Sequence, residues 1–231
     1  MRIETVLVAG ATGRTGRDVV DVLLDAGYRV RGATTTDTGA ESLEIQGCAE
    51  TVVGDLRDPE VATRAVEGVD AVVSCVGSAP TDVLGGDLVD DVGVANLAAA
   101  AADAGVERFV LESAIGVGDS SPGMPAPFRF AIGPIVRAKE RGETALRTAG
   151  VEYVVVRPGG LTDGPATGDL LVAEGGDTVS GTVARADVAR LLVAALTTPE
   201  AANRTFEVVS HAGVRGSPAG SVTVEWDWPD R

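Results

Sequence analysis

Three glycines near the start of the chain have the spacing of a phosphate-binding turn. Gly10, Gly13 and Gly16 follow the apolar run IETVLVA and open into the amphipathic stretch RTGRDVVDVLLDAG. In a strand–turn–helix unit, one glycine permits a sharp turn, another lets backbone amides approach a pyrophosphate, and the third lets helix and strand pack closely. Such spacing is frequent in a glycine-rich chain and is weak evidence by itself. The prediction of a dinucleotide site therefore depends on the order strand, glycine turn, helix. The alternative is an ordinary strand-to-helix turn.

The other reactive residue types form no second catalytic pattern. His211 is the only histidine, and no Ser-His-Asp or Cys-His order accompanies it. Cys48 and Cys75 lack metal-ligand spacing, so we expect packed thiols and no metal site. The adjacent acids Asp90 and Asp91 are typical of a solvated helix face and not of an acid–base pair.

Hydrophobic periodicity predicts the elements that position the glycine turn. Strands are predicted at Ile3–Ala9, Arg29–Thr34, Glu50–Gly54, Ala71–Val76, Glu107–Ser113, Glu152–Arg157 and Thr205–Ser210. Helices are predicted at Arg14–Ala26, Pro59–Val66, Asp87–Ala104, Pro134–Ala149 and Arg185–Leu196. This alternation indicates one α/β domain over residues 1–231, with a Rossmann-type, doubly wound, mostly parallel sheet.

Within that domain we expect a cofactor core at about residues 1–157 and a small substrate or lid region at 158–231. The irregular segments Gly116–Gly133 and Pro158–Thr178 follow predicted strand ends, where open α/β sheets bind ligands. Near the C-terminus, the alternating VTVEW predicts an edge strand or a lid.

The composition limits the partners. The 231 residues carry a net charge of −15, with one lysine among the basic residues, which argues against a nucleic-acid partner. Acid excess, scarce lysine and abundant alanine, valine and glycine resemble proteins of salt-accumulating microbes, so we expect a halophilic origin; an acidic mesophilic protein is the alternative. No signal segment or apolar stretch of bilayer length stands out in the sequence, which predicts a cytoplasmic protein without a membrane partner.

Four further motifs occur in order along the chain. They are GDLRDP at 54–59, VVSCVG at 72–77, NLAAAAADAGVERFVLESAIG at 96–116 and VVVRPGGLTDG at 154–164. Together with the glycine turn, they resemble the atypical short-chain dehydrogenase/reductase family, in the NAD(P)-binding branch that includes NmrA-like regulators and flavin and biliverdin reductases. The resemblance runs from about residue 3 to residue 210 and implies a bound dinucleotide.

The resemblance also implies which residues bind the cofactor. The glycine turn contributes Gly10, Thr12, Gly13, Arg14, Thr15 and Gly16; later segments contribute Thr34, Thr35, Asp55, Leu56, Cys75, Val76, Gly77, Lys139, Pro158, Gly159, Gly160 and Leu161. Asp55 and Leu56 would lie against the adenine, and Pro158 to Leu161 would flank the nicotinamide. The alternatives without a cofactor role are a turn cap at Asp55, the end of a buried strand at Cys75 and an ordinary Gly-Pro turn at Gly159.

The choice of coenzyme depends on the residues after the second predicted strand. An acid there accepts the 2′-hydroxyl of NAD, whereas a base accommodates the 2′-phosphate of NADP. This chain has Thr34 and Thr35, where relatives commonly carry an arginine at the second position, and no carboxylate before Asp37. Because hydroxyls donate to phosphate and Arg14 adds a cation, we favour NADP(H) over NAD(H). A solvated first-turn position is the alternative for Arg14.

Lys139, the only lysine, falls where the family places its active-site lysine. In relatives it ends a Tyr-x-x-x-Lys helix motif, in which the ammonium bonds the nicotinamide ribose and lowers the phenol pKa. Here Ile135 stands at the tyrosine position, so no phenol donates a proton. Ser113 occupies the family's serine position, where a hydroxyl would hydrogen-bond the acceptor; a strand-end cap is its alternative. The neighbouring Glu112 is expected to point to the opposite face.

These residues favour hydride transfer to a small conjugated acceptor. A flavin, a quinone or a linear tetrapyrrole delocalises charge and takes its proton from water, so this chemistry survives the loss of tyrosine. The alternative is a non-catalytic NAD(P) redox sensor or assembly factor that retained the cofactor site. A nucleotide-sugar epimerase or dehydratase is disfavoured, because such enzymes need the tyrosine and a larger substrate domain.

Overall fold

A mostly parallel sheet forms the centre of the computed structural model, which describes residues 3–86, 88–123, 132–176 and 179–229. Eight strands run in the order β3-β2-β1-β4-β5-β6-β10-β8, and only β8 is antiparallel to its neighbour. They are β1 (Thr5–Ala9), β2 (Arg29–Thr34), β3 (Glu50–Val53), β4 (Ala71–Ser74), β5 (Arg108–Glu112), β6 (Tyr153–Pro158), β8 (Leu170–Ala173) and β10 (Arg204–Ser210). A second sheet pairs β7 (Gly160–Thr162) with β9 (Thr182–Ala184) in parallel.

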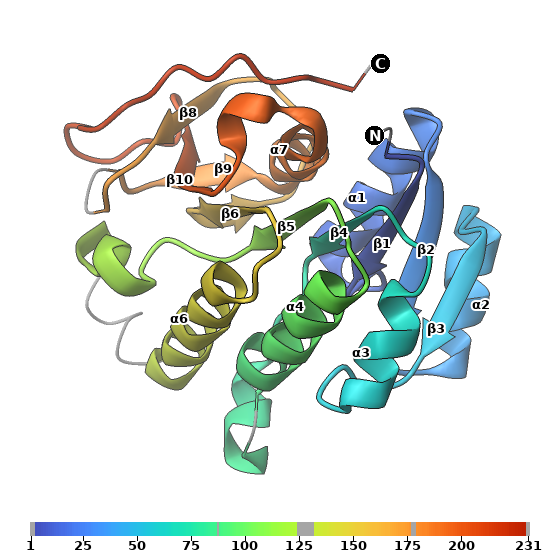
Figure 1. Ribbon diagram of the computed structural model, residues 1–231. Coiled ribbons are helices and arrows are strands. Elements are labelled where there is room, and N and C mark those ends of the chain that lie inside the picture. The colour runs from blue at the N-terminus through green and yellow to red at the C-terminus, as the bar shows by residue number, and fades with distance from the viewer. Residues whose placement is uncertain (1–2, 87, 124–131, 177–178, 230–231) are drawn as a thin grey trace.

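Helices cover both faces of the large sheet (Figure 1). One face carries α1 (Arg14–Asp25), α2 (Asp37–Gln46) and α7 (Arg185–Thr197); the other carries α3 (Pro59–Val66), α4 (Val94–Asp103) and α6 (Gly133–Thr148). The central strands are rich in valine and are buried from both sides, as parallel sheets require. The predicted Rossmann-type α/β fold is confirmed.

The long helix predicted at Asp87–Ala104 is replaced by two elements. A π-helical turn occupies Val89–Gly93 and α4 begins at Val94, while Asp87 lies outside the described residues. Close packing on α6 explains the difference, because a Cβ on Gly142 would lie 2.1 Å from the carbonyl oxygen of Asp90. The two elements therefore meet backbone to backbone, and the π turn directs Asp90 inward.

Short elements were missed where their periodicity is weak. Helix α2 buries only Ala40 and Leu43 and begins where the Thr36 hydroxyl accepts a hydrogen bond from the Gly39 amide, at 3.1 Å. Strands β7, β8 and β9 lie in or just after the segment predicted to be irregular, Pro158–Thr178. Part of the other irregular segment, Gly116–Gly133, lies outside the described residues.

The predicted edge strand at VTVEW is wrong. Strand β8 takes the edge of the sheet, and the segment after Gly220 pairs with it only through one isolated bridge, Ala173 to Ser221. Trp226 instead packs edge-on against Phe206, with ring centroids 5.2 Å apart. This segment runs over the side of the molecule that carries α7 (Figure 1). Its contacts there are made by side chains and not by a strand ladder.

Candidate functional site

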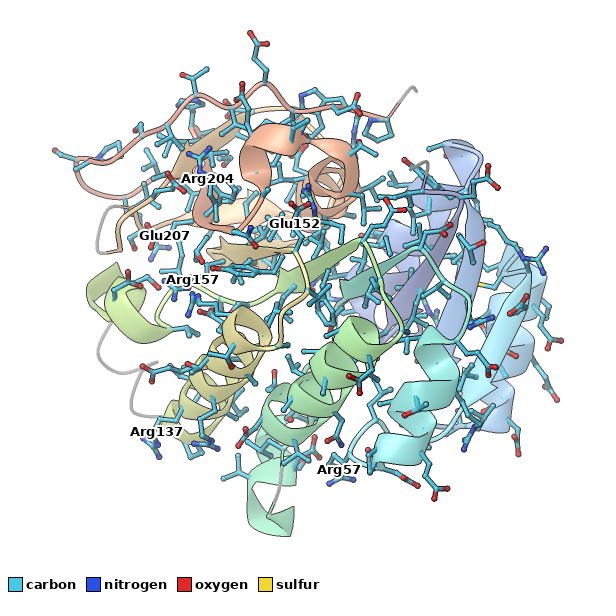
Figure 2. The ribbon with its side chains drawn as sticks, viewed as in Figure 1. Arg57, Arg137, Glu152, Arg157, Arg204 and Glu207 are labelled. Atoms are coloured by element: carbon cyan, nitrogen blue, oxygen red, sulfur yellow. The ribbon has the colours of Figure 1, made fainter. Side chains whose placement is uncertain are left out.

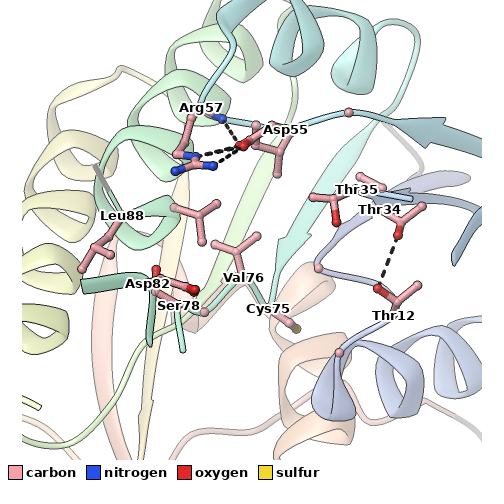
Figure 3. A pocket seen from close by; sticks show the side chains of 17 residues that line it. Thr12, Thr34, Thr35, Asp55, Arg57, Cys75, Val76, Ser78, Asp82 and Leu88 are labelled. Carbon is pink, nitrogen blue, oxygen red and sulfur yellow. Dashed lines mark hydrogen bonds and ion pairs between the residues drawn. The ribbon is translucent and has the colours of Figure 1, made fainter. Parts of the chain in front are cut away.

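A cleft of about 500 Å³ lies at the carboxyl ends of β1, β2, β3 and β4. The strand order reverses between β1 and β4, and open α/β sheets bind their ligands at such a reversal. Figure 3 shows the side chains that surround the cleft. Its lining consists of Gly10, Thr12, Gly13, Ala33, Thr34, Thr35, Gly54, Asp55, Leu56, Arg57, Cys75, Val76, Gly77, Ser78, Asp82, Leu88 and Val89.

The glycine turn forms one wall and has the shape that a pyrophosphate requires. Gly10 has a φ of +74°, and the Gly13 amide donates to the Gly10 carbonyl at 2.9 Å. Gly13 also caps α1, whose N-terminus has no side-chain cap and no acid in its first turn. A Cβ on Gly10 would lie 2.8 Å from the carbonyl oxygen of Cys75, so the loop and the end of β4 approach closely. The backbone therefore presents a helix N-terminus to the cleft, which suits an anionic phosphate.

Gly16→Ala is expected to abolish dinucleotide binding. Its Cβ would lie 2.1 Å from the Gly10 carbonyl oxygen, so the turn must open before the helix can pack. Gly133→Ala is the matched control, because its Cβ would meet only the flexible end of Arg137. The measurement is calorimetric titration with NADPH, with circular dichroism to verify folding. Equal affinity for NADPH in the Gly16→Ala variant and the parent would contradict this reading of the turn.

The structure brings part of the predicted cofactor set into this cleft. The predicted residues that line it are Gly10, Thr12, Gly13, Thr34, Thr35, Asp55, Leu56, Cys75, Val76 and Gly77. The predicted residues that do not line it are Arg14, Thr15, Gly16, Lys139, Ser113, Pro158, Gly159, Gly160 and Leu161. Gly16 and Thr15 face the packed interior, whereas the others belong to neighbouring elements.

The end of the cleft beside β2 and β3 is hydroxyl-rich and has an arginine that the sequence analysis missed. The Thr12 and Thr34 hydroxyl oxygens lie 3.5 Å apart. Arg57 pairs with Asp55, and its hydrogen bonds hold the pKa of the Asp55 carboxyl below its ordinary value. Figure 3 shows Asp55 between Arg57 and Thr35. The GDLRDP motif contained Arg57, but only the fold shows that it reaches the cleft.

Lys139 of α6 is held at the other end of this region by a buried carboxylate. Its ammonium lies 2.8 Å from Oδ1 of Asp90, whose side chain is fully buried. Burial opposes the charge on both groups, but their mutual attraction outweighs it, raising the pKa of Lys139 and lowering the pKa of Asp90. Asp90 also accepts from the backbone amide of Ser78 at 2.6 Å. The solvated face predicted for Asp90 is therefore wrong, because the π turn places it in the interior.

The residues near Lys139 include no phenol. Ile135 is buried in a small apolar cluster with Leu88 and Ala138. The Ser113 hydroxyl donates to Oε1 of Glu143 at 2.5 Å, so its proton faces α6 and not the cleft. Ile135 thus lies in the apolar packing of α6, and Ser113 is oriented by Glu143 of the same helix.

Glu112 points to the opposite face from Ser113, as expected. Its buried carboxylate accepts from the Thr15 hydroxyl at 3.0 Å and lies beside the Cys75 thiol. Burial raises the pKa of Glu112, and the charge of Lys139 only partly offsets this effect. Burial also raises the pKa of the Cys75 thiol, with Glu112 adding to the shift. Glu112 at the end of β5 and Cys75 after β4 thus lie within electrostatic reach of Lys139 of α6, which is paired with Asp90 of the π turn.

Glu112→Gln is expected to increase the free energy of unfolding at neutral and alkaline pH. Folding raises the pKa of Glu112 above its ordinary value of 4.5, so the stability it contributes is complete below that pH and is lost as the pH rises through the folded pKa. Glutamine cannot ionise and keeps an acceptor for Thr15. Urea unfolding from about pH 4 to about pH 8 should show the advantage of the variant growing with pH. An advantage independent of pH would refute the assignment.

Arg14 turns away from the hydroxyl-rich end. It pairs with Asp163, which follows β7, and Asp163 also lies 3.5 Å from Nε of Arg185. Just before that point, the Gly159 amide donates to the Val208 carbonyl at 2.8 Å and Gly160 begins β7. The predicted meeting of Arg14 with a 2′-phosphate therefore has no geometric support, since that phosphate is expected near Thr34.

No group of three or more histidine, cysteine, aspartate or glutamate side chains in the described part of the chain could hold a metal ion. Among the same residues, no helix has both the length and the apolar character to cross a membrane.

Comparisons with known proteins point to one family. Residues 10–199 match the family model described as NAD(P)H-binding. Sanguinarine reductase of Eschscholzia californica is 29% identical over 250 residues, covering 89% of each chain. Photosystem II assembly factor Ycf39 of Trieres chinensis is 30% identical over 217 residues, covering 90% of this chain and 65% of that protein. The structure of ChuY, an anaerobillin reductase from Escherichia coli O157:H7, aligns with a TM-score of 0.80 and 27% identity, covering 93% of this chain and all of that one.

Proposed function

The chain belongs to the NAD(P)H-binding family, and we propose that it is an oxidoreductase that transfers hydride from NAD(P)H to a small conjugated acceptor without a tyrosine acid. The observation that carries this proposal is Ile135, which is 8% exposed and fills the tyrosine position of the helix beside Lys139. An acceptor such as a flavin or a quinone delocalises the added charge and takes its proton from water. Two reductases among the similar proteins support the reaction class.

Each part of the site has a proposed role. The turn from Gly10 to Gly16 binds the pyrophosphate, and Lys139, oriented by Asp90, bonds the nicotinamide ribose. The bound coenzyme supplies the hydride. Ser113 contacts the acceptor; because its proton is donated to Glu143, its oxygen accepts a hydrogen bond from an N–H group such as that of a flavin or a tetrapyrrole. The residues around Gly160 flank the nicotinamide.

We also propose a preference for NADP(H) over NAD(H). Thr12, Thr34 and Thr35 line the end of the cleft that follows β2, and their hydroxyls can donate to a 2′-phosphate. The acid that lines that side, Asp55, is already paired with Arg57. An NAD-specific site would instead place a free carboxylate against the 2′-hydroxyl.

The test is a pair of measurements on the intact protein in molar KCl. Calorimetry with NADPH and NADH gives the two affinities, and absorbance at the nicotinamide band is then followed as FMN and a quinone are added. Binding with oxidation establishes the reductase and its coenzyme. Binding without oxidation rejects hydride transfer to these acceptors, and no binding rejects the coenzyme site itself.

A redox sensor or assembly factor is the second candidate. The same Ile135 favours it, since a chain that keeps the coenzyme site and lacks the acid can respond to NAD(P)H without turnover. The similarity to an assembly factor points the same way. This candidate predicts tight coenzyme binding and no oxidation with any acceptor.

We further propose that the protein works in the cytoplasm of a halophile, where salt screens its net charge of −15. The free energy of unfolding is then expected to rise as KCl increases from about 0.1 M to about 1 M, because the Debye length falls from about 10 Å to about 3 Å. Urea unfolding at each KCl concentration measures this. Stability that falls over the same range would contradict the proposal.

A further inference from the structure

Two arginines converge on one carboxylate beside the N-terminus of α1. Arg14 pairs with Oδ2 of Asp163, and Nε of Arg185 lies 3.5 Å from Oδ1 of the same residue. Each oxygen of the carboxylate thus faces a different guanidinium group. We call Arg14 and Arg185 the two-arginine site. An arginine fork is the group that proteins use most for carboxylates and phosphates.

Paired strands build this site. The register of β7 and β9 sets Thr162 opposite Ala184, so the next residues, Asp163 and Arg185, emerge together. The loop after Asp163 is held by Asp187, which accepts from the Thr167 and Gly168 amides at 2.8–3.0 Å. Arg185 also begins α7, whose N-terminus adds positive potential. The fold therefore fixes the backbone of Asp163 and Arg185, whereas the exposed Arg14 side chain is oriented by its pairing with Asp163.

Arg185 is only partly satisfied by its neighbours. Its side chain is 11% exposed and its Nη1 donates to the Thr15 hydroxyl at 3.2 Å. Its buried Nε has no hydrogen-bond partner among the described residues, although Asp163 is near. A buried guanidinium N–H without a partner gains from a better-placed acceptor. Asp163 thus neutralises charge at the two-arginine site but leaves Nε of Arg185 without a hydrogen bond.

Asp163 can also be displaced easily. Its side chain is 69% exposed and that of Arg14 is 66% exposed, so water screens their pairing and it adds little to stability. Nearby charges are balanced: Asp18 lies close to both arginines, and buried Glu112 faces Arg185. An incoming anion therefore replaces a solvated carboxylate, while Asp18 and Glu112 stay beside the arginines.

The geometry points to an acceptor that carries a terminal carboxylate or phosphate, which binds the two-arginine site by replacing Asp163. This inference rests on the proposed function, because it assigns the acceptor's anionic group to the segment that follows the residues flanking the nicotinamide. The site lies outside the residues that line the coenzyme cleft. We therefore assign the two-arginine site to the second substrate and not to the adenosine half of the coenzyme.

Matched acceptors test this inference. FMN and riboflavin share the isoalloxazine ring and differ by the phosphate, whereas a linear tetrapyrrole and its dimethyl ester differ by the carboxylate charges. Equilibrium binding of each to the NADP⁺-loaded protein, and the KM of each, are measured for the parent, Arg14→Gln, Arg185→Gln and Asp163→Asn. Arg17→Gln removes an exposed cation from the same helix and is the control.

The parent is expected to bind one anionic member at least about tenfold more tightly than its neutral partner, the value of one charge-assisted hydrogen bond. Arg14→Gln and Arg185→Gln should remove that preference, Asp163→Asn should increase it, and Arg17→Gln should leave it unchanged. The pair that shows the preference identifies phosphate or carboxylate as the anion.

Equal affinities within both pairs for the parent, or a preference that both arginine variants keep, overturn the inference even when NADPH is oxidised. So does a result in which both arginine variants weaken NADPH binding and leave the acceptor preference intact, since the arginines then serve the coenzyme. An arginine-dependent preference without NADPH oxidation keeps the anion site and rejects the reductase. The two proposals therefore fail separately.

Discussion

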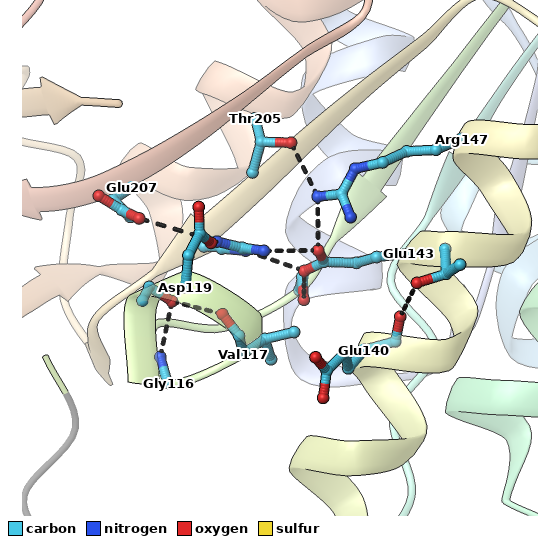
Figure 4. A network of polar contacts seen from close by, with 12 residues as sticks. Gly116, Val117, Asp119, Glu140, Glu143, Arg147, Thr205 and Glu207 are labelled. Carbon is cyan, nitrogen blue, oxygen red and sulfur yellow. Dashed lines mark hydrogen bonds and ion pairs between the residues drawn. The ribbon is translucent and has the colours of Figure 1, made fainter. Parts of the chain in front are cut away.

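Arg157→Met is expected to lower the free energy of unfolding by about 3–5 kcal/mol, because it removes the cation from a buried ionic network. Arg157 of β6 is 3% exposed and donates to both oxygens of Glu143, at 3.0 and 2.7 Å. It also bonds Asp119 at 2.5 Å and lies 3.8 Å from Glu207. Figure 4 shows Asp119, Glu143 and Glu207 in this network. Figure 2 shows Arg157 and Glu207 adjacent on their strands. Without Arg157, buried Glu143 loses its bidentate partner and keeps the pair with the partly exposed Arg147.

Urea unfolding monitored by circular dichroism measures this effect. Arg204→Met is the matched control, since it removes an arginine that is 32% exposed and paired with the similarly exposed Glu174, and such pairs contribute within about 1 kcal/mol. Arg157→Met combined with Glu143→Gln should recover part of the loss, because one stranded charge is then removed. Equal losses for Arg157→Met and Arg204→Met would show that the network is not a stabilising unit.

Lys139→Met is expected to weaken NADPH binding and to destabilise the fold at the same time. The fold loses about 3–5 kcal/mol, because fully buried Asp90 is left without its cation. The coenzyme loses the ammonium that we assign to the ribose. Arg141→Gln, which breaks an exposed pair with Asp91 on the same helix, is the control and should change neither property strongly.

A double variant separates the two roles of Lys139. Lys139→Met with Asp90→Asn replaces the buried ion pair by neutral groups, so much of the lost stability should return. The affinity for NADPH, measured by calorimetry, should stay low if Lys139 contacts the ribose. Full recovery of that affinity would mean that Lys139 only compensates Asp90, and the ribose assignment would be wrong.

Most of the architecture was predictable because it follows from local pattern. Valine-rich runs with turn residues between them predicted the strands β1, β2, β4, β5 and β6 to within two residues at each end. Helix α2 and strand β8 escaped prediction, because α2 buries only two side chains and β8 is four residues long within a glycine-rich stretch. A short element is defined by the surface that it packs on, which periodicity does not reveal.

In the candidate site, too, some features follow from local sequence and others only from the tertiary structure. The sequence by itself determined the glycine turn, the hydroxyls after β2 and the absence of a tyrosine before Lys139, because each depends on neighbouring residues. Only the tertiary structure decided that Asp90 is buried against Lys139, that Ser113 faces Glu143 and that Arg14 meets Asp163, 149 residues away. These partners lie on different elements, and the burial that makes their charges matter exists only once the sheet and its helices are packed.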